Sequence, residues 1–92
     1  MQYKPEPIDT DNITLPTSLQ PLVERLAEDC HDNWAKIRLE TGWTYGPRRN
    51  DETKTNPCLV PYNMLSEEEK DVDRNSVIST LKLIIKFGYT IS

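Results

Sequence analysis

Apolar residues recur every three or four positions between about residues 18 and 41, which is the spacing of one face of an α-helix. Thr17 or Ser18 is a suitable cap for the start of this helix, and Gly42 is suited to end it in the left-handed conformation. At 100° per residue the apolar positions fall within an arc of about 140°. They are Leu19, Leu22, Val23, Leu26, Ala27, Cys30, Trp34 and Ile37.

A second helical pattern covers about residues 66–87. Ser66 and Glu69 have the spacing of a capping box, and Gly88 is expected to end the helix. Its apolar stripe consists of Val77, Ile78, Leu81, Ile84 and Ile85. Two amphipathic helices of this kind are expected to pack antiparallel, with their apolar faces closing one small core.

The remaining segments predict little regular structure. Prolines favour an extended segment over residues 1–18, and turn signals indicate a long ordered loop over residues 42–65. Within the loop, residues 57–62 are expected to form a short edge strand, and residues 89–91 a strand that pairs with the N-terminal segment. We therefore predict a mainly α (α+β) fold with short flanking β-strands, forming a single domain over residues 1–92.

Composition narrows the classes of function. The 92 residues suffice for one domain, and 11 basic against 15 acidic side chains give a net charge of −4. This charge argues against binding to long nucleic acid. No apolar run approaches the roughly 20 residues of a membrane-spanning helix, and the N-terminus lacks the pattern of a secretory signal. With Cys30 and Cys58 as its only cysteines, the chain is expected in the cytoplasm without a disulfide framework.

The sequence offers no recognisable catalytic or metal-binding pattern. His31 is the single histidine, and it follows Cys30 directly, so the two side chains would point about 100° apart on a helix. That geometry does not suit a nucleophile and its base. The spacings of zinc, calcium and phosphate-binding loops are absent. We therefore expect no enzyme activity, no metal and no cofactor.

Aromatic and cationic residues lie on or beside the apolar faces of the two predicted helices and in the segment directly after the first helix. Such a combination suits a flat anionic ligand, for example a nucleotide, stacked on a ring and held by charge. The residues in question are His31, Trp34, Arg38, Trp43, Tyr45, Arg48, Lys70 and Arg74. A structural interpretation is also open, in which Trp34 belongs to the core, His31 is structural and the cations pair with nearby acids.

The second helix has apolar residues on the side away from its stripe. Val72, Leu83 and Phe87 share an arc roughly opposite Leu81. If no loop covers them, they form an exposed strip suited to another copy of the chain or to a partner protein.

Five segments resemble the ryanodine receptor repeat, the RyR domain family, in the order found in that family. The resemblance runs from about residue 3 to residue 91. The matching segments are Tyr-Lys-Pro-Glu-Pro-Ile-Asp-Thr (3–10), Leu-Ala-Glu-Asp-Cys-His-Asp-Asn-Trp-Ala (26–35), Gly-Trp-Thr-Tyr-Gly-Pro-Arg (42–48), Asn-Pro-Cys-Leu-Val-Pro-Tyr (56–62) and Glu-Lys-Asp-Val-Asp-Arg (69–74).

The resemblance implies a mainly helical module of the kind found in tandem pairs in the cytoplasmic shell of calcium-release channels. Single copies also occur in small prokaryotic and phage proteins, and this chain resembles those. It implies an interaction module without enzyme activity, with a nucleotide-like ligand as the alternative function. Since a tandem partner is absent, a homodimer or a partner protein is expected. The residues implied for the site are His31, Trp34, Arg38, Trp43, Tyr45, Arg48, Tyr62, Lys70 and Arg74.

Overall fold

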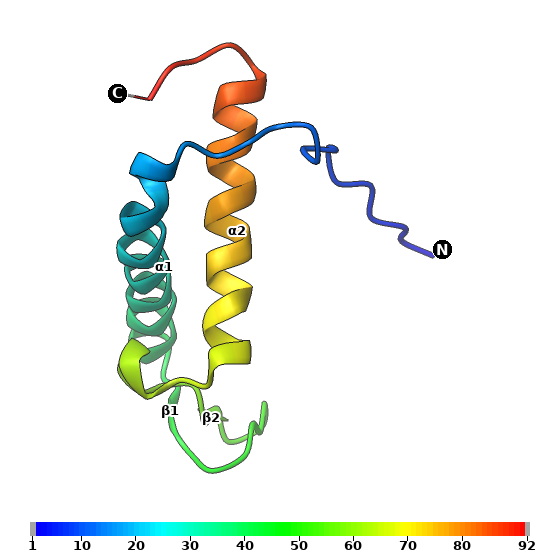
Figure 1. The fold of residues 1–92 in the computed structure, drawn as a ribbon. Coiled ribbons are helices and arrows are strands. Elements are labelled where there is room, and N and C mark those ends of the chain that lie inside the picture. Colours follow the sequence, from blue (N-terminus) through cyan, green and yellow to red (C-terminus); the bar gives the residue numbers. More distant parts are fainter. Residues whose placement is uncertain (1, 92) are drawn as a thin grey trace.

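The computed structural model describes residues 2–91 as two long helices joined by a loop that contains a very small sheet (Figure 1). Helix α1 covers Gln20–Glu40 and helix α2 covers Glu67–Lys86. The predicted fold class, mostly helical with short strands, is thereby confirmed. No helix within residues 2–91 is long and apolar enough to cross a membrane.

Helix α1 begins differently from the prediction and ends as predicted. A 3₁₀ turn over Thr17–Leu19 leads into α1, and no side chain caps either start. The expectation that Thr17 or Ser18 caps the helix is therefore wrong. The 3₁₀ turn supplies backbone partners instead, because the Leu19 amide donates to the Pro16 carbonyl oxygen and the Gln20 amide to the Thr17 carbonyl oxygen. At the other end, Gly42 adopts the left-handed conformation, with φ of 95°.

Helix α2 begins at the predicted capping box. The Ser66 hydroxyl accepts a hydrogen bond from the Glu69 backbone amide at 3.2 Å, and the Glu69 carboxylate accepts one from the Ser66 amide at 3.3 Å. Three glutamates in the first turn, residues 67–69, also interact favourably with the helix dipole. The helix ends before Gly88, whose φ is 91°.

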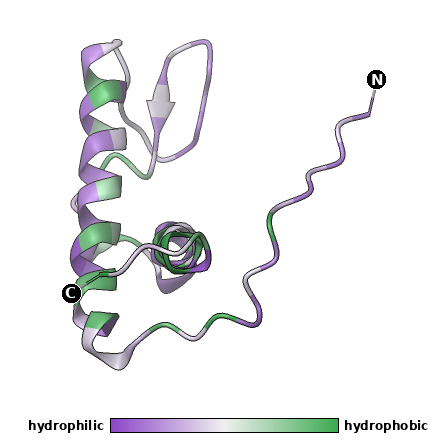
Figure 2. Cartoon of the chain, turned by 90° about the horizontal axis from the view of Figure 1, so that it is seen from above, coloured by the Kyte–Doolittle hydropathy of each residue, from purple (hydrophilic) through white to green (hydrophobic). Residues whose placement is uncertain are grey.

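The two helices run in opposite senses in Figure 1 and cross steeply. Figure 2 looks along α2 and shows α1 lengthwise across the view. The core lies where they cross, and Ala27 at this place is completely buried. Among residues 2–91 only seven hydrophobic residues are buried, and they are Leu15, Val23, Ala27, Tyr62, Leu65, Val77 and Leu81.

The strands lie within the loop that connects the helices. Strand β1 (Thr44–Tyr45) pairs in parallel with strand β2 (Thr55–Asn56), and Gly46 follows β1 at a close approach to β2. A Cβ atom at Gly46 would lie 2.6 Å from the Thr55 Cβ, so only glycine fits there.

Both predicted strands, over residues 57–62 and residues 89–91, are wrong. Residues 57–62 form turns that lead into a 3₁₀ turn over Tyr62–Met64, because the chain must reverse there to enter α2. Residues 89–91 also form no strand. The N-terminal segment is instead tied to α2 by the Lys86 ammonium group, which donates a hydrogen bond to the Asp9 carbonyl oxygen.

The N-terminal residues 2–9, called here the arm, are extended and exposed along their whole length. Figures 1 and 2 both show the arm directed away from the two helices. The radius of gyration is 16.0 Å, against about 12 Å for a compact domain of this length. In the arm, Tyr3 is 85% exposed and Ile8 is 52% exposed. Leu15, which follows the arm in the chain, is buried in the core.

Candidate functional site

A buried histidine connects α1 to the loop that precedes α2. The His31 side chain is 4% exposed, and its Nε2–H donates a hydrogen bond of 2.7 Å to the Val60 carbonyl oxygen. Its ring lies 5.5 Å from the Trp34 ring and 6.2 Å from the Tyr62 ring, between centroids. The structural interpretation of His31 is thus supported, since its Nε2 holds the loop in place.

Beside His31 lies a cavity of about 300 Å³ between the C-terminal half of α1, the loop and the start of α2. Trp34, Leu65 and Val72 supply apolar walls, and Glu69 and Asp73 supply carboxylates. The full set of lining residues is His31, Trp34, Cys58, Leu65, Glu69, Val72 and Asp73. This cavity therefore offers apolar surface with negative charge and suits a neutral or cationic group better than an anion.

The thiol of Cys58 in this cavity is protonated at neutral pH. It donates a hydrogen bond to the Glu69 carboxylate. Burial, followed by this hydrogen bond, raises the pKa of the Cys58 thiol to about 11. The hydrogen bonds from Cys58 and then Ser66 lower the pKa of Glu69, which is therefore ionised. Because a thiolate is the reactive form, Cys58 is poorly suited to act as a nucleophile.

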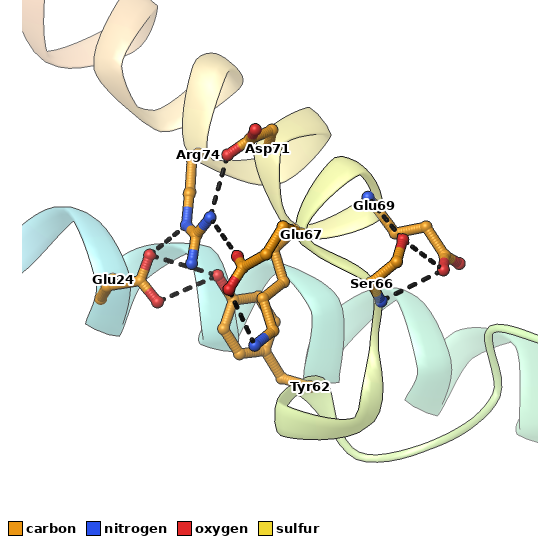
Figure 3. A network of polar contacts seen from close by, with 8 residues as sticks. Glu24, Tyr62, Ser66, Glu67, Glu69, Asp71 and Arg74 are labelled. Atoms are coloured by element: carbon orange, nitrogen blue, oxygen red, sulfur yellow. Dashed lines mark hydrogen bonds and ion pairs between the residues drawn. The ribbon is translucent and has the colours of Figure 1, made fainter.

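Arg74 on α2 forms ion pairs with three carboxylates. Its guanidinium donates to Glu24 on α1, to Glu67 at 2.8 Å and to Asp71 at 2.9 Å (Figure 3). The hydrogen bond from Arg74 holds the pKa of Glu24 below its usual value, against the opposing effect of burial. Arg74 thus joins the two helices, and its charge is already neutralised by carboxylates.

Lys70 also has partners within the chain. Its ammonium group lies 5.5 Å from the centroid of the buried Tyr62 ring and 3.9 Å from a Glu67 carboxylate oxygen. The Tyr62 hydroxyl donates to Glu24 at 3.3 Å, and burial raises the pKa of Tyr62. Lys70, Tyr62 and Arg74 therefore belong to one network between the helices, which Figure 3 shows around Arg74.

Arg38 lies near both tryptophans. Its guanidinium carbon is 5.9 Å from the centroid of the Trp34 ring and 5.0 Å from that of Trp43. Within residues 2–91 it forms no ion pair, so for Arg38 the alternative in which the cations pair with nearby acids is not found. Three cations were proposed on the helices, namely Arg38, Lys70 and Arg74. Within residues 2–91, Lys70 and Arg74 have carboxylate partners and Arg38 has none.

The nine candidate residues are thus divided between four places. His31 and Trp34 line the cavity, while Tyr62, Lys70 and Arg74 form the network. Arg38 and Trp43 lie together at the end of α1. Tyr45 on β1 and Arg48 in the loop are exposed, and the Arg48 carbonyl oxygen accepts a hydrogen bond of 3.0 Å from the Thr55 hydroxyl.

The sequence interpretation missed four residues of the cavity, namely Cys58, Leu65, Glu69 and Asp73. Glu69 had a sequence signal, because the capping box fixes its side chain at the start of α2. Cys58 and Leu65 come from the irregular loop, whose path is not readable from periodicity. Asp73 lies four residues after Glu69 and therefore on the same side of α2.

The predicted strip on α2 is exposed at both ends. Val72 is 67% exposed and Phe87 is 61% exposed, while Leu83 between them is half-buried. Val72 also lines the cavity, so the cavity and the strip are continuous.

The two helices, the capping box and the loop that returns to α1 through His31 define a small helical repeat module. The chain belongs to the RyR domain family, whose sequence model matches residues 3–92. The resemblance found from the five sequence segments is confirmed by this match. Membership supports the class of a protein-interaction repeat module, and it is not membership of a known catalytic family.

Proposed function

We propose that this chain is a non-catalytic interaction module that assembles with a second copy of itself. The contact uses the face of α2 that carries Val72, Leu83 and Phe87. These positions are eleven and four residues apart, so they lie on one side of the helix. Ser76 and Ser79 lie beside them, and such small side chains permit a second helix to approach closely.

The observation that carries this proposal is the large surface of the isolated chain. It exposes 7329 Å², whereas a compact monomer of 10.7 kDa exposes about 5,500 Å². The excess of about 1,800 Å² is more than the roughly 800 Å² that each partner of a standard-size specific interface buries. No large side chain among residues 2–91 is completely buried, which also supports a fold that is completed by association.

The protonated state of Cys58 supports the non-catalytic part of the proposal, because it removes the most obvious nucleophile. A cytoplasmic location belongs to the same proposal. It is supported by the free thiols of Cys30 and Cys58, which suit a reducing compartment.

Analytical ultracentrifugation at micromolar to millimolar concentrations tests the assembly. We expect a species of twice 10.7 kDa, and we expect Phe87→Glu to shift it to the monomer. Phe87 is preferable to Leu83 because it is exposed, so its substitution disturbs the fold less. Leu39→Glu is the matched control, since Leu39 is 57% exposed on α1 and lies off the strip. A wild-type chain that stays monomeric refutes the proposal.

A second candidate function is the binding of a nucleotide-like anion beside Arg38 and Trp43. The uncompensated charge of Arg38 next to two indole rings favours this site, whereas Lys70 and Arg74 are already occupied by carboxylates. A nucleotide at ten times its Kd should stabilise the fold by about 1.4 kcal/mol. A thermal-shift screen of adenine and cyclic nucleotides tests this, with Arg38→Gln as the variant that should lose the shift. No shift at millimolar concentration excludes the site.

A further inference from the structure

The arm and the cavity have complementary chemistry. The tip of the arm carries Tyr3 and Lys4 at adjacent positions, both exposed and ahead of the acidic Glu6 and Asp9, while the cavity combines apolar walls with the carboxylates of Glu69 and Asp73. We propose that the arm of one copy inserts into the cavity of a second copy, with Tyr3 in the apolar part and Lys4 beside Asp73. This inference rests on the self-association proposed above and identifies the segment that each copy exchanges.

The size of the cavity supports this occupant. At about 300 Å³ it lies at the lower end of the range for small-molecule sites, which is about 300–1,000 Å³. Such a volume suits a single large side chain. Tyrosine has the required form, because its ring is apolar and its hydroxyl can reach a polar group. The wall of Trp34 offers an aromatic surface for that ring.

Asp73 supports the choice of a cationic neighbour. Its side chain is half-buried at the cavity, and in residues 2–91 it takes part in no hydrogen bond or ion pair. Glu69 beside it is ionised, since its pKa is lowered by hydrogen bonds from Cys58 and Ser66. The cavity therefore has an uncompensated negative charge at the place where Lys4 of the arm would lie.

The position of the arm fits a symmetric exchange. Lys86 holds the base of the arm at the C-terminal end of α2, and the cavity lies at the N-terminal end of the same helix. In a two-fold contact along the strip, Phe87 of one copy faces Val72 of the other. The base of each arm then lies beside the cavity of the other copy, within the reach of about 20 Å that residues 3–9 have when extended.

Beyond the hydrogen bond from Lys86 to Asp9 at its base, the arm is directed away from the helices of its own chain (Figures 1 and 2). Both apolar residues of the arm, Tyr3 and Ile8, remain in solvent in the isolated chain. In a symmetric dimer each copy would insert its Tyr3 into the cavity of the other copy, so that both tyrosine side chains would be buried. The exchange would thus remove two exposed aromatic side chains together.

Charge reversal on the two sides tests the exchange, with dimer dissociation constants measured by analytical ultracentrifugation. We expect Tyr3→Ala, Lys4→Glu and Asp73→Lys each to raise the constant at least tenfold. The double variant Lys4→Glu, Asp73→Lys should return it to within threefold of the wild type. Lys36→Glu on the exposed face of α1 is the control with the same change in net charge. Circular dichroism verifies the fold, and Asp73→Asn replaces Asp73→Lys if the latter unfolds.

The outcomes separate this inference from the proposed function. A dimer that persists in Tyr3→Ala and Lys4→Glu overturns the exchange of arms and leaves self-association through the strip intact. A wild-type chain that remains monomeric overturns both. Weakening by the single variants without recovery in the double variant overturns the pairing of Lys4 with Asp73.

Discussion

Replacing His31 tests how firmly the loop before α2 is held to α1. His31→Phe keeps a ring of similar size and removes the hydrogen bond to the Val60 carbonyl oxygen. A buried carbonyl oxygen left without its hydrogen bond costs about 1–3 kcal/mol. Because Val60 is only half-buried, we expect the free energy of unfolding to fall by about 1–2 kcal/mol. His31→Ala also removes the ring from the core, which raises the loss to about 3 kcal/mol.

These losses are large for a chain of this size. The free energy of unfolding expected for 92 residues is about 5–14 kcal/mol. Since 1 kcal/mol shifts the Tm of a small domain by about 4–8 °C, His31→Ala should lower the Tm by about 12–24 °C. Urea denaturation followed by circular dichroism measures the free energy, and thermal melts measure the Tm.

The control is Asp32→Ala, because Asp32 is the neighbouring residue on α1 and is exposed. Its substitution should change the free energy of unfolding by no more than about 0.5 kcal/mol. If both His31 variants stay within the same limit, the bond from His31 to Val60 does not hold the loop, and the reasoning is refuted.

Three further predictions concern the cap of α2, the loss of stability at acid pH, and the reactivity of the two cysteine thiols. Ser66→Ala removes the capping acceptor and should cost about 1 kcal/mol in urea denaturation. Thermal melts should show stability falling as the pH drops below 4.5, the ordinary pKa of a glutamate. The folded chain holds the pKa of Glu24 below that value through Arg74, so acid favours the unfolded chain, which binds the proton more tightly. A chromogenic disulfide reagent at pH 8 should modify the exposed Cys30 well before Cys58, whose pKa is about 11.

Each of these has a control and a contrary outcome. The control for the cap is Ser79→Ala, which should change the free energy of unfolding by less than about 0.5 kcal/mol. If Ser66→Ala has no larger effect than Ser79→Ala, the role of the cap is contradicted. Arg74→Met should flatten the dependence of the Tm on acid pH, so an unchanged profile would show that this ion pair does not cause it. Glu69→Gln should speed the modification of Cys58, and equal rates for both thiols in the wild type would contradict their different environments.

The helices could be predicted because their signals are local. The apolar period and the capping box placed α2 within one residue of its observed bounds, Glu67–Lys86. The β1–β2 pair could not be predicted, because each strand has two residues and too few positions for an alternating pattern. Its parallel pairing depends on the path of the loop and on the fit of Gly46 against Thr55.

The candidate site was predicted in part for a similar reason. His31 and Trp34 lie on one helix, so their spacing alone places them together. Arg74 was expected to be available for a ligand, yet one of its carboxylates is Glu24, fifty residues earlier in the chain. Ion pairs between helices depend on the crossing of α1 and α2, which a single sequence does not reveal.

The steep crossing of α1 and α2 has a consequence for how the molecule opens. The buried hydrophobic residues of the two helices are Val23 and Ala27 on α1 and Val77 and Leu81 on α2, and the parts of each helix farther from them receive less support. Helices of about 20 residues are only marginally stable without such packing. Amide hydrogens near the crossing should therefore exchange with solvent slowest, and those at the helix ends first.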